Sequence, residues 1–171
     1  MQAEPDENFL LNKKFQNGIS LLKKYNFTYD ILIYPNQLPA AVKFVQKNPE
    51  QKFILDHIAK PYIKKKEIKP WALQIKELAK NQNVYCKLSG IITEADHKNW
   101  NAREIFPYLD IVFSAFGSDR LTFGSDWPVC LLAGSYEQVL NLIEEYLKNE
   151  SEETKEKIFY KNAISFYGVI N

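Results

Sequence analysis

The stretch RLTFGSDWPV, residues 120–129, joins an apolar run to a glycine, an aspartate and a Trp-Pro pair. The β-branched and aromatic residues predict a strand over 120–126. Pro128 cannot donate a hydrogen bond to a neighbouring strand, so the chain must turn away there. The strand therefore leaves Asp126 at its carboxyl end, where a parallel sheet exposes polar groups to ligands.

Alternation along this strand sorts its side chains into two faces. Thr122, Gly124 and Asp126 share one face, whereas the larger Leu121 and Phe123 share the other. The larger set suits packing against an outer helix, and the smaller set suits the interior of a barrel.

Strand and helix patterns alternate along the rest of the chain. Further strands are predicted at 29–34 (YDILIY), 52–57 (KFILDH) and 84–89 (VYCKLS). Helical patterns occupy 15–22, 39–46, 70–80, 103–116, 135–147 and 159–167. Pro107 is expected to break the helical pattern at 103–116 and to start a second helical piece. Ser135 and Gln138 have the spacing of a capping box. This order predicts an α/β fold with a parallel sheet, in a single domain over residues 1–171.

Polar residues collect where the predicted strands end, and ligands bind at that edge of parallel sheets. They are Tyr34, Asp56, His57, Lys87, Ser89 and Asp126. Alternation over 52–57 places Phe53, Leu55 and His57 on the inward face and Asp56 on the opposite face. An inward His57 and an inward Asp126 would then meet above the sheet.

Composition excludes several classes of protein. The 171 residues are 46% hydrophobic and 25% charged, which is typical of a globular chain. The net charge of +1 gives no reason to expect nucleic acid or an anionic membrane as a partner. No apolar stretch approaches the length of a membrane span, and the polar N-terminus is unlike a signal peptide. Cys86 and Cys130 form no CxxC pair, so we expect a reducing, cytoplasmic location.

Four motifs together resemble the amidohydrolase-related family. They are FILDHIAKP at 53–61, VYCKLSG at 84–90, LTFGSDWPV at 121–129 and NAISFYG at 162–168. Within that superfamily, the chain is most similar to the branch that hydrolyses lactones of sugar acids and dicarboxylated pyrones. The resemblance extends from about Asp6 to Tyr167 and implies a TIM-type (β/α)8 barrel, with the predicted strands as its fifth to eighth.

The resemblance also implies roles for two residues. His57 matches the histidine that ends the sixth strand. Asp126 matches the aspartate that ends the eighth strand and accepts a proton from the attacking water. In metal-containing relatives both positions lie at or near a divalent ion, often zinc, whereas some lactonases of this branch need no metal. The implied site therefore either holds one Zn or Mn ion at His57 and Asp126 or is metal-independent, and its substrate is a small sugar lactone or related carboxylate.

One departure from the family is large. Its first strand carries a His-x-His pair, but this chain has only His57 and His97. A complete barrel needs about 250 residues. In an open sheet the strands at 29–34 and 120–126 would be unpaired edges. We therefore expect the C-terminal half of a barrel, about four βα units, that needs a missing N-terminal half or a second copy and has little or no activity alone.

Other strand-end and loop residues are candidates for substrate binding, each with a structural alternative. Lys87 could contact a substrate carboxylate or hydroxyl, or hold its charge in solvent. Tyr34 could donate to substrate or pack as an aromatic. Trp127 could line the pocket or pack beneath it. His97 lies in a polar loop that is expected to overhang the pocket, or it is simply exposed.

Three further functions compete with a lactonase. A further conspicuous arginine or histidine near the pocket would favour a zinc-dependent decarboxylase of the same superfamily, but Arg103 and Arg120 lie in a helix and at a strand start. A non-catalytic half-barrel that serves in assembly predicts a stable homodimer. A flavodoxin-like nucleotide binder needs a glycine-rich loop after the strand at 29–34, and the sequence there has none.

Overall fold

A computed structural model of the chain describes residues 1–169. Four strands form a parallel sheet in the order β1-β2-β3-β4. They are β1 (Tyr29–Ile31), β2 (Phe53–Leu55), β3 (Val84–Leu88) and β4 (Leu121–Phe123). Every neighbouring pair runs parallel, so the predicted parallel α/β arrangement is confirmed.

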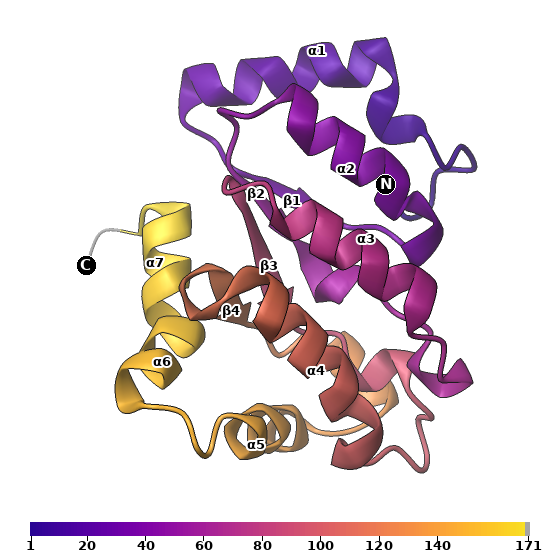
Figure 1. Cartoon of the computed structure of the whole chain (residues 1–171), viewed down its shortest axis with the longest axis vertical. Helices are drawn as coiled ribbons and strands as arrows, with labels where there is room; N and C mark the ends of the chain where they lie inside the picture. Colours follow the sequence, from indigo (N-terminus) through magenta and orange to yellow (C-terminus); the bar gives the residue numbers. More distant parts are fainter. Residues whose placement is uncertain (170–171) are drawn as a thin grey trace.

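Helices alternate with these strands (Figure 1). They are α1 (Lys13–Leu22), α2 (Leu38–Lys47), α3 (Lys69–Ala79), α4 (Ala102–Phe116), α5 (Tyr136–Tyr146), α6 (Glu152–Glu156) and α7 (Asn162–Tyr167), with a π-helical turn at Lys157–Lys161. Short 3₁₀ turns lie at Phe9–Leu11, Lys23–Tyr25, Pro35–Gln37, Asp56–Ala59, Ile63–Lys65, Ile92–Glu94, Ser118–Arg120 and Val129–Leu132. The predicted capping box of Ser135 and Gln138 begins α5. Within residues 1–169 no helix is both long and apolar enough to cross a membrane.

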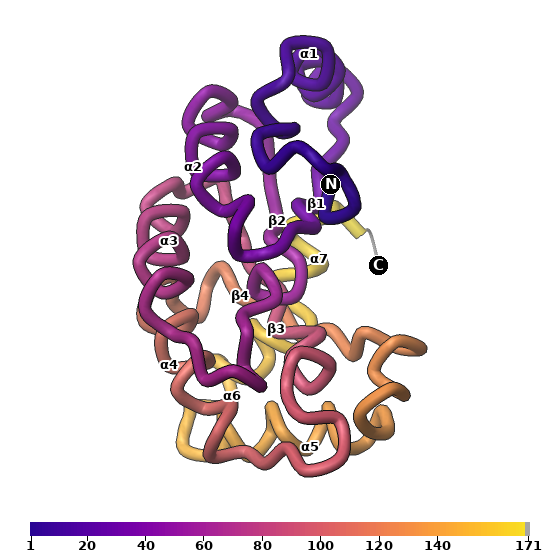
Figure 2. Tube along the Cα trace, turned by 90° about the vertical axis from the view of Figure 1, so that its right-hand side faces the viewer, coloured from indigo at the N-terminus to yellow at the C-terminus, as the bar shows by residue number. Residues whose placement is uncertain are grey.

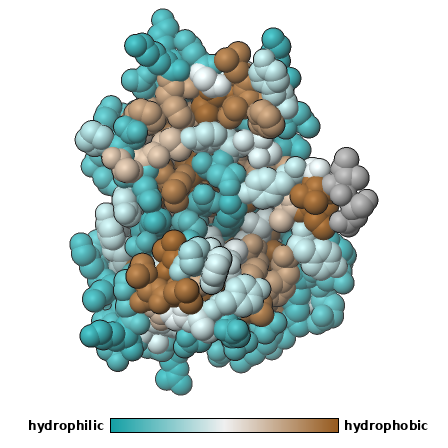
Figure 3. All heavy atoms as spheres, turned by 180° about the vertical axis from the view of Figure 1, so that it is seen from behind, coloured by the Kyte–Doolittle hydropathy of each residue, from teal (hydrophilic) through white to brown (hydrophobic). Residues whose placement is uncertain are grey.

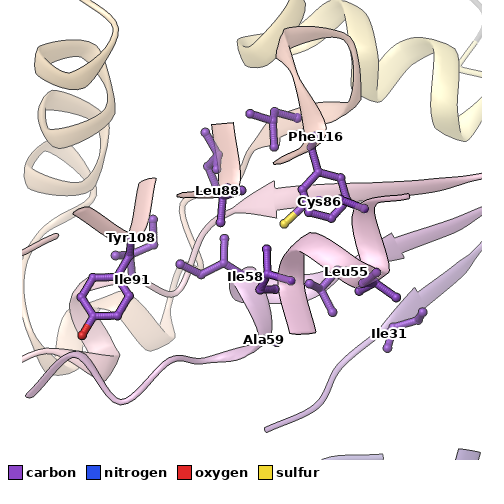
Figure 4. Packing of buried hydrophobic residues seen from close by; sticks show 14 of the residues in the cluster. Ile31, Leu55, Ile58, Ala59, Cys86, Leu88, Ile91, Tyr108 and Phe116 are labelled. Carbon is purple, nitrogen blue, oxygen red and sulfur yellow. The ribbon is translucent and has the colours of Figure 1, made fainter. Parts of the chain in front are cut away.

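One face of the sheet is covered by α2, α3 and α4 (Figure 2). Ile31, Leu55, Cys86 and Leu121 are aligned across the strands by register, and all are fully buried. Figure 4 shows three of them in the core beside Leu88 and Phe116. Burial of this row holds the strands in the register that brings their carboxyl ends together.

The opposite face of the sheet carries charged groups. Lys87 donates a hydrogen bond to Asp30. Its Nζ also lies 2.8 Å from Oδ1 of Asp56, at an angle outside hydrogen-bond geometry. Helix α7 covers part of this face, where the ring of Phe166 packs 4.9 Å from that of Tyr85. From this side, hydrophilic side chains occupy the centre and apolar ones gather in separate patches (Figure 3).

The predicted break of the helix at Pro107 is wrong. Helix α4 runs without interruption through this proline. The hydrogen bond that Pro107 cannot donate would reach the first turn of the helix, near its solvated start. Full burial of Ile105, Leu109 and Val112 outweighs the cost of about 3 kcal/mol for an interior proline.

The predicted alternation of residues 52–57 is also wrong. Phe53 and Leu55 belong to the buried face that packs on the helices, and Asp56 shares the face of Lys87. The strand ends at Leu55, and His57 has a positive φ of 53°. His57 therefore reaches its position through a turn, which the two-residue period of a strand does not describe.

Candidate functional site

The residues that follow β2, β3 and β4 meet at the carboxyl edge of the sheet. His57 Nε2 lies 3.5 Å from Asp126 Oδ1. On the other side of the ring, His57 Nδ1 shares a hydrogen bond of 2.8 Å with Ser89 Oγ. The side chains of His57 and Asp126 are 18% and 13% exposed, so both are sheltered but reachable. The structure thus brings together the imidazole and the carboxylate that the sequence singled out.

A left-handed turn presents His57. His57, Ile58, Ala59 and Lys60 have φ values of 53°, 46°, 59° and 50°, although none of them is glycine. Each such residue costs about 1–2 kcal/mol. Residues held in this way concentrate at functional sites.

Packing holds this turn in place. Ile58 and Ala59 are fully buried, and Figure 4 shows them in the core beside Leu88 and Ile91. The indole Nε1 of Trp71 donates a hydrogen bond of 2.8 Å to the carbonyl oxygen of Ile58. The turn therefore fixes His57 and Lys60 to the core of the fold.

A glycine makes room for the imidazole. Gly90 has a φ of 60°, and a Cβ added there would lie 2.7 Å from Cγ and Nδ1 of His57. Any larger residue at this position must displace the ring. The KLSG motif thus supplies both the hydrogen-bond partner of His57, through Ser89, and the space for its ring.

The surroundings of His57 favour its neutral form. Burial lowers the pKa of His57. The charge of Asp126 raises this pKa, and the charges of Lys60 and Lys87 lower it, so that the net effect is a lowered pKa. A neutral imidazole keeps one nitrogen that can accept a hydrogen bond or bind a metal ion. The hydrogen bond to Ser89 orients the ring so that Nε2 faces Asp126.

Of the four predicted substrate-binding residues, Lys87 is ion-paired within the protein, and Tyr34, Trp127 and His97 are exposed. Lys87 is paired with Asp30 and Asp56, and its pKa is raised by those carboxylates against the effect of burial. Tyr34 is exposed at the end of the segment after β1, with its ring 5.5 Å from Lys60 Nζ.

Trp127 and His97 lie on the outside of the site. Trp127 is 65% exposed, so it does not pack beneath the site. His97 is exposed, and its Nε2 lies 2.8 Å from the carbonyl oxygen of Thr93. Their contact with substrate stays a prediction.

Lys60 and Glu94 were not predicted as site residues. Lys60 Nζ lies 3.9 Å from Glu94 Oε1, and the two side chains are 17% and 21% exposed. Burial raises the pKa of Glu94, whereas the charge of Lys60 lowers it. Glu94 ends the short turn Ile92–Glu94 that follows Gly90, the residue packed against the ring of His57. The FILDHIAKP motif contained Lys60, but no strand or helix period indicates where a left-handed turn directs a side chain.

The residues present could supply only part of a metal site. His57 and Asp126 offer one imidazole nitrogen and one carboxylate. Among residues 1–169, no three His, Cys, Asp or Glu side chains are grouped as a metal centre requires. Zinc in a catalytic site takes three protein ligands, so His57 and Asp126 could supply two of the three.

Comparison with known proteins identifies the family. The profile described as Amidohydrolase matches residues 2–169. The chain therefore belongs to the amidohydrolase family.

Several curated relatives are named as lactonases. One is L-fucono-1,5-lactonase of Burkholderia multivorans, 36% identical over 159 residues, with 87% of this chain and 54% of the relative aligned. Another is L-rhamnono-gamma-lactonase of Scheffersomyces stipitis, 25% identical over 156 residues, with 78% of this chain and 45% of the relative aligned. The chain spans about half the length of these relatives.

Solved structures agree with the fold. An amidohydrolase from Burkholderia multivorans with bound zinc superposes with a TM-score of 0.95 at 34% identity, covering 99% of this chain and 62% of the other. A putative 2-pyrone-4,6-dicarboxylic acid hydrolase from Pseudomonas putida gives a TM-score of 0.77 at 18% identity, covering 98% of this chain and 60% of the other. The second likeness concerns the fold alone.

Proposed function

We propose that this chain carries half of the active site of a lactonase that hydrolyses a sugar-acid lactone. The observation that carries the proposal is the approach of His57 and Asp126, 3.5 Å apart at the carboxyl edge of a parallel sheet. Relatives named as L-fucono-1,5-lactonase and L-rhamnono-gamma-lactonase support a sugar-acid lactone as the substrate class.

The proposed reaction begins with Asp126. Its ionised carboxylate accepts a proton from a water molecule while the oxygen of that water attacks the lactone carbonyl carbon. His57, held by Ser89, presents Nε2 toward the carbonyl oxygen and stabilises the negative charge that develops there. The bond between the carbonyl carbon and the ring oxygen then breaks. The ring oxygen takes the proton that Asp126 holds, and the product is an open hydroxy acid.

A divalent ion is compatible with this arrangement but is not required by it. Zinc or manganese, when bound, would be held by His57 and Asp126 together with ligands from outside these residues, and it would polarise the lactone carbonyl. The zinc in the related structure from Burkholderia multivorans supports this option. The position of Ser89 behind His57 is also typical of residues that orient a metal-binding imidazole.

We further propose that residues 1–171 are one unit that contributes the second half of a (β/α)8 barrel. In the described residues β1 and β4 each have a neighbouring strand on one side only. Unpaired strand edges are unstable in water unless they are covered. The relatives are about twice as long as the aligned region, so they have the length for four more strands. These strands would come from the same polypeptide, a separate one or a second copy.

A fusion protein tests the lactonase proposal. The N-terminal part of the Burkholderia multivorans L-fucono-1,5-lactonase that this chain does not cover is joined to residues 1–171. We expect the fusion to hydrolyse L-fucono-1,5-lactone, with and without added Zn²⁺ or Mn²⁺, and the chain alone to show little turnover. A folded fusion without lactonase activity would contradict the proposal. Rapid turnover by the chain alone would contradict the need for a second half.

Replacing Ser89 with alanine tests how His57 is oriented. The substitution removes the hydrogen bond to Nδ1, so the ring can rotate away from Asp126. We expect kcat/KM of the fusion to fall about 10- to 100-fold. Ser20→Ala, which removes an exposed hydroxyl in α1, is the control and should leave kcat/KM unchanged. Equal activity of both variants would mean that Ser89 does not position the ring.

A second candidate function is assembly without catalysis. The exposed apolar side chains of the segment after β4 favour it, and they are Trp127, Val129, Leu131 and Leu132. This function predicts a stable homodimer of the isolated chain. Light scattering of the purified chain distinguishes the cases, because a monodisperse monomer at all concentrations argues against assembly through copies of this chain.

A further inference from the structure

Two charged side chains beside the proposed catalytic pair have unused capacity for hydrogen bonds. In the described part of the chain, neither Lys60 Nζ nor the Glu94 carboxylate makes a side-chain hydrogen bond. Their separation of 3.9 Å is at the long end of an ion pair, and both side chains are about four-fifths buried. An ammonium can donate three hydrogen bonds, and a carboxylate can accept several. Partly buried charges without such bonds are costly unless a ligand or solvent supplies them.

The neighbouring lysine provides a contrast. Lys87 lies on the same edge of the sheet, but it is hydrogen-bonded to Asp30 and within ion-pair distance of Asp56. Its charge is neutralised by the protein. Of these two lysines, Lys60 is the one whose donors remain available to a ligand.

Lys60 and Glu94 lie close to the reacting groups. Glu94 lies 3.9 Å from Lys60, in the turn that follows Gly90, and Gly90 packs against the ring of His57. His57 and Lys60 are three residues apart in the same left-handed turn. Burial of Ile58 between them holds the backbone of this turn in place. Lys60 and Glu94 thus lie on the segments that follow β2 and β3, at the carboxyl edge of the sheet where His57 meets Asp126.

The chemistry of this pair fits hydroxyl groups. A hydroxyl group accepts a hydrogen bond from an ammonium and donates one to a carboxylate. An adjacent donor and acceptor therefore suit adjacent hydroxyls of a sugar ring. The ring of Tyr34, 5.5 Å from Lys60 Nζ, adds apolar surface for the carbon face of the same ring.

We propose that Lys60 and Glu94 are specificity-determining residues that bind adjacent hydroxyl groups of the lactone. This assignment rests on the lactonase proposal, and it explains how the site would distinguish one lactone from another. The pair selects polyhydroxylated lactones over unsubstituted ones, because a lactone without hydroxyls would leave both charges without partners.

Nuclear magnetic resonance of the full chain tests this inference without turnover. The chain has only two histidines, so ring-labelled histidine gives two sets of imidazole signals. The probes are D-glucono-δ-lactam, which carries hydroxyls and resists hydrolysis, and δ-valerolactam, which lacks them. We expect gluconolactam to shift the His57 signals and to bind at least about 10-fold more tightly than valerolactam.

Variants assign the selection to the pair. Lys60→Met and Glu94→Gln should each weaken gluconolactam binding about 10-fold or more and leave valerolactam binding unchanged. Lys60→Arg keeps a donor and should retain most of the preference, which separates loss of the contact from loss of the fold. The control is Lys64→Met, since Lys64 is 66% exposed and pairs with Asp96 at 3.4 Å.

Three results would overturn the assignment. They are equal binding of both lactams, wild-type binding by Lys60→Met and Glu94→Gln, and no shift of the His57 signals with gluconolactam. The lactonase proposal is judged separately by turnover of the fusion protein. A fusion that hydrolyses the lactone while its Lys60→Met form keeps the preference for hydroxylated lactones would reject only the role of the pair.

Discussion

Replacing Asp126 with asparagine is expected to lower kcat of the fusion protein about 10²- to 10⁴-fold and to leave its fold intact. The amide has nearly the shape of the carboxylate, but it cannot accept the proton of the attacking water. Asp126 has a positive φ of 58°, and asparagine adopts this conformation readily. The backbone after β4 should therefore be unchanged.

The measurement pairs turnover with thermal unfolding. Asp119→Asn is the matched control, because Asp119 lies just before β4 and its 76% exposed side chain forms a surface ion pair with Lys157. Asp119→Asn should retain activity within about twofold, since surface changes of this kind have small effects. If Asp126→Asn hydrolyses the lactone at the wild-type rate, Asp126 is not the general base.

Replacing Gly90 with alanine is expected to damage both stability and activity. The positive φ of 60° costs an alanine about 1–2 kcal/mol. The new methyl group would also lie 2.7 Å from the imidazole of His57, so the ring must move. A displacement of about 1 Å at a reacting group can cost about 10²-fold in rate. We expect a loss of activity of that size in the fusion protein.

The control for this substitution is another glycine. Gly18 lies on the exposed side of α1, and a Cβ added there meets nothing within 4 Å. Gly18→Ala should raise the free energy of unfolding by about 0.5–1 kcal/mol, because alanine favours a helix. Urea denaturation of the chain measures both variants. A Gly90→Ala chain as stable as the wild type would show that the backbone and His57 adapt freely at this position.

The broad arrangement of this protein follows from its sequence. Strand and helix periods are local, so the order of elements and the parallel sheet could be predicted from them. The approach of His57 and Asp126 could also be predicted, because the carboxyl ends of parallel strands meet at one edge. The family could be recognised from the residues at those ends.

The details of the site could not be predicted from such periods. A left-handed turn formed by His57, Ile58, Ala59 and Lys60 contradicts the local preferences of all four residues. It exists because tertiary packing buries Ile58 and because Trp71 bonds to its carbonyl group. The direction of Lys60 and the position of the His57 ring against Ser89 both depend on that turn. The uninterrupted course of α4 through Pro107 has the same cause, since burial of the helix overrides the local preference of proline.

The left-handed turn also links the reactivity of this protein to residues that no substrate touches. Ile58 is buried between His57 and Lys60 in the chain. A small change in the shape of the core around Ile58 would therefore shift both polar side chains together. Natural variation in buried aliphatic residues could therefore retune which sugars are accepted while the visible lining of the site stays the same. A search for altered selectivity in this lineage should sample the interior as well as the rim.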